Sequence, residues 1–233
     1  MWNGKKKAVT LSFDDGTLQD FRLLELLRKY NLKATFNLNS GLLGQAGSLD
    51  FQSIGGNVVD HTTVDSSKVK ELYAEHEVAV HTLTHPNLTT LDDETVIRQV
   101  EEDRKALTAL CGYEVIGMAY PCGGVNNDER VAEVVRKHTG VRYARTITST
   151  HGFDLQENLY RFNPSVHIIE DCLLSLAEAF LQAPSDRPQL YYIWGHAFDL
   201  DVFDGGWERA EKLFEMIANR EDVFYGTNKE VLL

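Results

Sequence analysis

Short apolar runs that are typical of buried strands alternate with segments of helical periodicity along the whole chain. The first two runs are "KAVTLSF" at 7–13 and "KATFNLNS" at 33–40, and the segment between them carries apolar residues at 18, 21, 24 and 27, a helical stripe. An order of strand, helix, strand imposes parallel pairing through right-handed crossovers. About seven such units predict one α/β domain over 1–233, folded as a barrel or near-barrel.

The same order continues to the last residues. After residues 41–66, which lack periodicity and are expected to form a binding loop or lid, "SSKVKELYAEH" predicts a short helix with Ser67 as a candidate N-cap. The remaining elements are predicted as strand "EVAVHTLTH", helix from Asp92 and Asp93 through Leu110, strand "EVIGMAY", helix 127–138, strand "VRYARTI", a loop through 165, helix 171–182, strand "QLYYIWGH", helix 207–219 and strand "DVFYGT".

Charge limits the partners that such a chain can have. The 233 residues carry 35 acidic and 23 basic side chains, a formal charge of −12. This charge repels phosphate backbones and anionic lipids, so we expect neither nucleic acid nor membrane as a partner. The sequence gives no sign of its oligomeric state.

Cysteine usage and the N-terminus predict the compartment. Three cysteines are too few for a disulfide framework. The basic start leads directly into a strand without a leader-like apolar region, and no run approaches 18 apolar residues. We therefore expect a cytoplasmic protein.

Polar residues gather where four of the predicted strands end. In parallel α/β folds the carboxyl ends of the strands carry the functional groups. The residues at these ends are Asp14 and Asp15, His81 and His85, the loop 121–124, and His196. Four separate strands are thus expected to supply one site.

The pair in "HTLTH", His81 and His85, is the strongest indication of a metal. Imidazole is a common zinc ligand, and two of them need only one carboxylate to complete a facial triad. Thr82 stands where the zincin motif has its glutamate, so the general base of that motif is absent. The alternative is that both histidines only cap a strand through hydrogen bonds to loops.

The adjacent carboxylates Asp14 and Asp15 point to opposite sides of an extended strand, unless the chain turns there. Gly16 permits such a turn. One carboxylate could then bind the metal while the other serves as a general base, because different environments give like groups different roles. The alternative is an ordinary N-cap turn before a helix.

These motifs together resemble the polysaccharide deacetylases of the NodB-homology type, carbohydrate esterase family four, in an atypical branch. "SFDDG", "HTLTH", "YPCGG" and "IWGH" occur in the family's order over nearly the whole chain. The resemblance implies a distorted (β/α)7-type barrel with one divalent metal, usually Zn²⁺ with Co²⁺, Mn²⁺ or Ni²⁺ as alternatives. It also implies a carbohydrate or small amide substrate.

The resemblance also implies roles for single residues. Asp14 would be the catalytic base, and Asp15, His81 and His85 the metal ligands. The backbone N–H of Cys122 would donate to the oxyanion, a task that tolerates a side-chain change; a nucleophilic thiol is the alternative. His196 would protonate the leaving amine, unless it is only a histidine satisfied at a strand end.

Two departures from the family pattern leave questions about the site. Ala119 stands where the family commonly has an arginine paired with the catalytic aspartate, and Arg145 and Arg161 are the candidates to replace it. Either arginine could instead be solvated or structural. The family's fourth motif has no clear match, so the partner of His196 is open among Asp199, Asp201 and Asn163.

Residues around the predicted catalytic groups are candidates for substrate binding. They are Tyr120, Pro121, Gly123, Arg145, Arg161 and Trp194. Phe51 and Trp207 could also stack on a sugar, although most aromatic residues must belong to the core.

Three functions remain open from the sequence. The first is N-deacetylation of an acetylated sugar or polysaccharide. The second is hydrolysis of a cyclic imide or ureide on the same fold, as in allantoinase-like relatives. The third is a non-catalytic carbohydrate-binding or structural relative with a vestigial metal site.

Overall fold

A parallel sheet of eight strands forms the centre of the molecule in the computed structural model, which describes residues 1–233. The strands are β1 (Lys7–Asp14), β2 (Thr35–Leu38), β5 (Glu77–Val80), β6 (Gly117–Ala119), β7 (Tyr143–Arg145), β8 (Val166–His167), β9 (Gln189–His196) and β10 (Val223–Tyr225). They pair in the order β7-β6-β5-β2-β1-β9-β8, and β10 pairs with the first residues of β1. The predicted parallel α/β architecture is confirmed.

The sheet curls until its two ends meet. Phe162 forms a parallel bridge with Arg145 of β7, and only a few residues later the same segment continues as β8 beside β9. The barrel is therefore closed by one bridge and a strand of two residues. The sequence predicted a loop through 165 and missed β8, because so short a strand has no periodicity to detect. A distorted barrel is the result.

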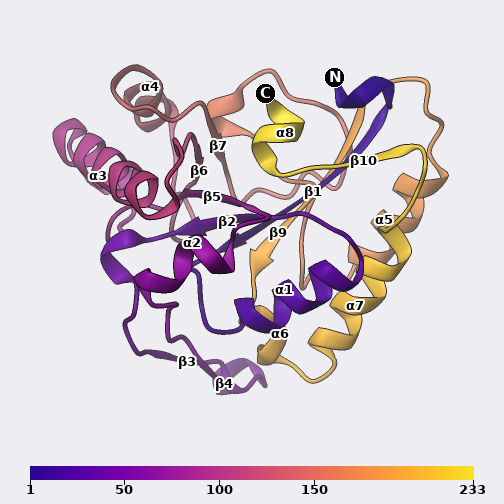
Figure 1. The fold of residues 1–233 in the computed structure, drawn as a ribbon, viewed down its shortest axis with the longest axis horizontal. Coiled ribbons are helices and arrows are strands. Elements are labelled where there is room, and N and C mark those ends of the chain that lie inside the picture. Colours follow the sequence, from indigo (N-terminus) through magenta and orange to yellow (C-terminus); the bar gives the residue numbers. More distant parts are fainter.

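Helices cover the outside of this curled sheet (Figure 1). They are α1 (Asp20–Lys29), α2 (Val69–Leu72), α3 (Asp93–Cys111), α4 (Glu129–His138), α5 (Leu173–Gln182), α6 (Asp199–Val202), α7 (Gly206–Ile217) and α8 (Asn228–Leu232). In Figure 1, α3 and α4 lie on one flank and α1, α5 and α7 on the other. No helix has the combination of length and apolar character that crossing a membrane requires.

Two details of the helix predictions are wrong. Asp65, not Ser67, caps the short 3-10 helix before α2, since its side chain accepts from the Ser67 N–H. The buried face of α1 is formed by Leu23, Leu24 and Leu27, whereas Leu18 and Phe21 from the predicted stripe are exposed. The helix begins at Asp20, so the stripe included one residue outside it.

Strand β1 alternates between an apolar and a polar face. Val9, Leu11 and Phe13 belong to the main hydrophobic core. Ser12, on the opposite face, accepts hydrogen bonds from two buried amides, those of Asn37 and Asn228. Because side chains alternate along a strand, Asp14 continues this polar row. The interior of the barrel therefore carries a hydrogen-bonded polar row that leads to Asp14.

The segment 41–66 contains an antiparallel hairpin, which the sequence predicted only as an irregular loop. The hairpin joins β3 (Ser48–Asp50) to β4 (Val58–Asp60) and projects from one side of the molecule, near α6 (Figure 1). Val59 packs with Phe198 and Val202 in a small cluster of its own. The N–H of Asn57 donates to the carbonyl of Val202 at 2.8 Å. The hairpin is thus fixed to the segment that follows β9.

Candidate active site and metal centre

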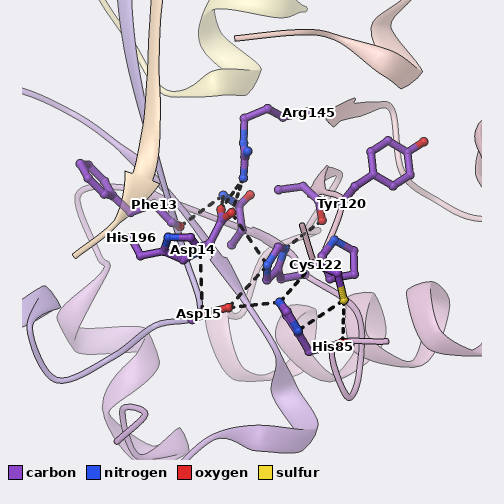
Figure 2. A network of polar contacts seen from close by, with 12 residues as sticks. Phe13, Asp14, Asp15, His85, Tyr120, Cys122, Arg145 and His196 are labelled. Atoms are coloured by element: carbon purple, nitrogen blue, oxygen red, sulfur yellow. Dashed lines mark hydrogen bonds and ion pairs between the residues drawn. The ribbon is translucent and has the colours of Figure 1, made fainter. Parts of the chain in front are cut away.

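The polar residues at the strand ends meet around one cavity of about 170 Å³. Its walls are Asp14, Asp15, His81, His85, Tyr120, Cys122, Gly123, Ile147, Trp194 and His196. Figure 2 shows Asp14, Asp15, His85, Cys122 and His196 converging from separate segments of the chain. The expectation that four strands supply one site agrees with this geometry.

Asp15, His81 and His85 form a group that fits a metal ion. Oδ1 of Asp15 lies 3.5 Å from Nε2 of His81 and 3.6 Å from Nε2 of His85. This oxygen is buried and accepts no hydrogen bond. An unpartnered buried carboxylate oxygen is costly, and a cation between the three atoms would remove that cost. Two imidazoles and one carboxylate are also a donor set that divalent metals such as zinc use.

The backbone at Asp15 explains how neighbouring carboxylates share one site. Asp15 has φ 73° and Gly16 φ 66°, both in the left-handed region. The chain therefore turns at Asp15 itself as well as at the glycine, and the Asp15 side chain comes to the same side as Asp14. A Cβ at residue 16 would lie 2.5 Å from the Leu38 side chain, so this turn requires glycine.

The two histidines meet because the loop between them folds back. In an extended strand, residues 81 and 85 would be about 13 Å apart, but their ring centroids lie 4.9 Å apart. Thr82 and His85 both have positive φ, 71° and 58°. The Asn39 amide donates to the carbonyls of residues 81 and 82, and Asp103 accepts from the His81 N–H. Buried polar side chains from outside the motif thus hold its strained backbone.

The tautomer and the protonation state of His81 are those that a metal ligand requires. Its Nδ1 lies 2.9 Å from the carbonyl oxygen of Ala119 and donates to it, so Nε2 carries the free lone pair toward Asp15. Burial lowers the pKa of His81 to about 4, although Asp14 and Asp15 act in the opposite direction. The ring is therefore neutral near pH 7, the state that binds a metal.

Arg145 supplies the partner of Asp14 that the sequence could not assign. Nη2 of Arg145 donates to both carboxylate oxygens of Asp14 (Figure 2). The amide of Asn37 donates to Oδ1 of Asp14 at 2.8 Å. Burial raises the pKa of Asp14, but the charge and hydrogen bonds of Arg145, together with the charge of His196, outweigh burial and lower the pKa below the usual range. Asp14 is therefore ionised and held in place, as a general base must be.

His196 is oriented by Asp199, one of the three partners considered. Oδ2 of Asp199 lies 3.0 Å from Nδ1 of His196 and accepts from the His196 N–H at 2.7 Å. Burial lowers the pKa of His196, but Asp199, Asp15 and Asp14 raise it to about 10. The ring is thus protonated near neutral pH, with Nε2 3.9 Å from Asp15 Oδ2.

The close approach of Asp199 depends on a glycine. A Cβ at Gly195 would lie 2.5 Å from the Ile168 side chain and 3.2 Å from Asp199 Oδ2. The other two candidates have different partners: Asp201 accepts from the Trp207 indole, and Asn163 from Thr146. His167, which the sequence did not indicate, approaches Asp199 at 3.3 Å.

The backbone N–H of Cys122 points into the site. It is directed at Nε2 of His85, 3.5 Å away, from a residue with φ 70°. The Asn126 amide donates to the carbonyls of residues 120–122 and fixes this turn. Such an N–H can donate to an oxyanion formed beside the three ligands.

The Cys122 thiol has a histidine neighbour that the sequence did not reveal, since Sγ lies 3.8 Å from Nδ1 of His85. Burial raises the pKa of this thiol, and the charge of Asp15 adds to the effect. Nucleophilic cysteines have lowered pKa values instead. The geometry favours the backbone role.

The candidate substrate-binding residues divide into two groups. Tyr120, Gly123 and Trp194 line the cavity, whereas Arg145 is not part of its wall and contacts the lining residue Asp14 instead. Arg161 lies elsewhere, bonded to Asn127 at 2.9 Å, and neither it nor Pro121 is part of the cavity wall.

The two further aromatic candidates for sugar stacking lie outside the cavity wall, whereas one residue that was not predicted is part of it. Phe51 packs against the hairpin cluster, and Trp207 belongs to the main core. Ile147, the last residue of the predicted strand "VRYARTI", also lines the cavity, and the sequence did not indicate it because an isoleucine carries no catalytic chemistry.

His61 is the other functional candidate that the sequence did not indicate. Its Nε2 lies 3.1 Å from Oδ2 of Asp15. A single histidine in a segment without periodicity carries no spacing signal, and only the tertiary fold places it at the site.

Comparison with known proteins agrees with this site. Residues 2–144 match the polysaccharide deacetylase family. A chitooligosaccharide deacetylase of Rhizobium leguminosarum bv. trifolii is 32% identical over 125 residues, which cover 52% of this chain and 49% of that protein. The chain spans about half or less of the length of the curated relatives it matches.

Solved structures show the same fold. The family 4 carbohydrate esterase from Streptomyces lividans, solved with acetate, has a TM-score of 0.55 at 18% identity, covering 96% of this chain and 93% of that one. A family 4 pseudoenzyme from Bacillus anthracis has a TM-score of 0.56 at 21% identity, covering 98% and 66%. The family match covers more than half of the chain, and the curled parallel sheet and the residues around the cavity agree with it. This chain therefore belongs to the polysaccharide deacetylase family.

Proposed function

We propose that this protein is a metal-dependent hydrolase that removes the acetyl group from an N-acetylated sugar or polysaccharide. The observation that carries the proposal is the convergence of a paired base, three metal-type ligands and a protonated histidine on one cavity. Asp14, Asp15, His81, His85 and His196 all line it. A vestigial metal site would require neither the ionised Asp14 nor the oriented His196.

Asp15, His81 and His85 would hold the metal, for which Zn²⁺ is our first candidate. Bound there, a divalent ion supplies Lewis-acid chemistry: it polarises the amide carbonyl and makes water easier to deprotonate. The remaining tasks, which are proton transfer and stabilisation of the oxyanion, belong to side chains and one backbone N–H.

Asp14 accepts the proton of the attacking water, and the Arg145 contact keeps its carboxylate ionised until then. The Cys122 N–H donates to the oxygen that becomes negative in the tetrahedral transition state. His196 gives its Nε2 proton to the departing amine as the C–N bond breaks. Acetate and a free amine leave, and the proton taken by Asp14 balances the one that His196 gave.

The case for a cyclic imide or ureide hydrolase is weaker than the sequence indicated. The absence of the usual arginine at residue 119 favours that alternative, but Arg145 provides a cationic partner for Asp14 from another strand.

Acetate release tests the proposal. Metal-free protein is reloaded with Zn²⁺, Co²⁺, Mn²⁺ or Ni²⁺ and supplied with chitooligosaccharides, peptidoglycan fragments, N-acetylglucosamine derivatives and, in parallel, small cyclic amides. We expect acetate from at least one acetylated sugar, lost on chelation and restored by metal. Turnover of the cyclic amides alone, or activity that survives chelation, would overturn the proposal.

A further inference from the structure

His61 contacts the metal-ligand candidate Asp15 from the hairpin segment, 46 residues away in the chain. The two oxygens of Asp15 have different surroundings. Oδ2 lies 3.1 Å from Nε2 of His61, whereas Oδ1 faces Nε2 of His81 and of His85 and accepts no hydrogen bond. Because an ionised carboxylate can only accept, Nε2 of His61 carries the proton of this contact.

The backbone places His61 independently of its side chain. Residues 62–64 run antiparallel beside 16–18, with a bridge between Thr17 and Thr63. The Leu18 N–H donates to the carbonyl of residue 62 at 2.9 Å, and the N–H of His61 donates to Gly47 at 2.8 Å. A substitution at residue 61 therefore leaves these backbone bonds in place.

A second contact fixes the direction of the ring. The His61 ring meets the Phe198 ring edge-on, with centroids 5.1 Å apart. Phe198 packs with Val59 of the hairpin, so ring and hairpin are held by the same cluster. His61 is only partly exposed, with 27% of its side chain accessible.

We propose that His61 is a positioning residue for the metal centre: by donating to Oδ2 of Asp15 it keeps Oδ1 directed at His81 and His85. The inference rests on the proposed function, since it presupposes a metal ion among these three side chains. Outer contacts of this kind orient metal ligands, and their loss typically weakens metal affinity about 10- to 100-fold.

The test measures metal affinity rather than activity alone. Metal-free wild type, His61→Ala, His61→Gln and a control, His138→Ala, are titrated with Zn²⁺ against a chromogenic chelator. His138 is exposed at the end of α4, away from the site. Thermal unfolding of the metal-free forms checks that each variant folds, and the absorption spectrum of the Co²⁺ forms reports the ligand field.

We expect H61A to bind Zn²⁺ about 10- to 100-fold more weakly. H61Q, whose amide N–H can reach Asp15, should keep an affinity within about threefold of wild type and a wild-type Co²⁺ spectrum. Wild-type affinity in H61A would overturn the inference. Equal losses in H61A and H61Q with an altered spectrum would also overturn it, because His61 would then be a metal ligand itself. Absence of metal binding in wild type would instead refute the proposed function, and this inference with it.

Discussion

Arg145 contacts Asp14 across the interior of the barrel, although three strands separate β7 from β1 in the sheet. In the pairing of β6 with β7, Arg145 lies directly opposite Ala119. The guanidinium of Arg145 therefore enters the barrel interior at the same level of the sheet as residue 119, but from the neighbouring strand β7. The curl of the sheet then brings the guanidinium to Asp14, so this carboxylate has a cationic partner although residue 119 is alanine.

Replacing Arg145 should impair both stability and catalysis. Arg145→Met leaves the Asp14 carboxylate buried without its cationic partner, and we expect a loss of about 3–5 kcal/mol in unfolding free energy. Arg145→Lys keeps the charge but not the planar donor group, and kcat should fall by roughly 100-fold because the base is held less firmly. Urea unfolding and acetate release measure the two effects. Arg161→Ala is the control, and a larger defect there would contradict this assignment.

Asp14→Asn should separate metal binding from hydrolysis. The amide cannot accept the proton of water, so we expect activity to fall by about 10²- to 10⁴-fold. Zn²⁺ affinity should change little, because the ligand oxygen belongs to Asp15. Metal titration and acetate release on the same preparation give the answer. An active D14N protein would remove Asp14 from the base role, and inactivity of both forms on every substrate would favour the non-catalytic alternative.

Cys122→Ala should remain active. The proposed donor is the backbone N–H, which alanine keeps, so kcat/KM should stay within about threefold of wild type. Cys122→Gly should behave alike, since glycine accepts the positive φ at this residue without strain. Loss of activity in both variants would show that the thiol itself is needed.

The His196–Asp199 pair should make the stability of the metal-free protein depend on pH. Burial lowers the pKa of His196, but Asp199, Asp15 and Asp14 raise it to about 10, against about 6.5 in an unfolded chain. A raised histidine pKa gives stability that is complete below pH 6.5 and is lost as pH rises toward 10. Asp199→Asn should therefore lower the unfolding free energy by on the order of 2 kcal/mol at pH 6, and by progressively less toward pH 10.

Urea unfolding of wild type and D199N between pH 6 and pH 10 measures this difference. A difference in unfolding free energy that stays constant between pH 6 and pH 10 would show that the charge on His196 does not cause it. In the metal-loaded enzyme, D199N should lower kcat more than it changes KM, because Asp199 orients the proton donor.

Asp20→Asn should stabilise the protein at alkaline pH. Asp20 is fully buried, its Oδ2 accepts from the Tyr73 hydroxyl, and its Oδ1 has no partner. Burial raises its pKa to about 8, with a contribution from the negative Asp15. A raised carboxyl pKa means that folding stability falls as pH rises from about 4 to 8.

Asparagine removes this ionisation and still accepts from Tyr73. The stability gain of D20N should grow between pH 4 and pH 8, reach on the order of 2 kcal/mol, and then level off. Denaturant unfolding at several pH values measures it. A gain that does not vary with pH would point to packing rather than to the buried charge.

The sequence by itself determined the architecture and the local motifs. The period of the apolar pattern changes between strand and helix along the chain, which predicts parallel pairing, and the polar residues fall where the strands end. Asp14 and Asp15, like His81 and His85, are close in sequence, so a local pattern was enough to select them. The same pattern could not detect β8 or the hairpin at 48–60, because both are too short for a period to show.

Only the tertiary structure decided which residues support those motifs. Arg145 acts on Asp14 because the sheet curls, Asp199 reaches His196 because Gly195 leaves room, and His61 meets Asp15 because residues 62–64 pair with 16–18. The Arg145–Asp14 and His61–Asp15 contacts join residues far apart in the chain, and such contacts have no fixed spacing in the sequence. They are set by strand order and closure of the barrel, which bring distant carboxylates, guanidinium and imidazole groups within a few ångströms of one another.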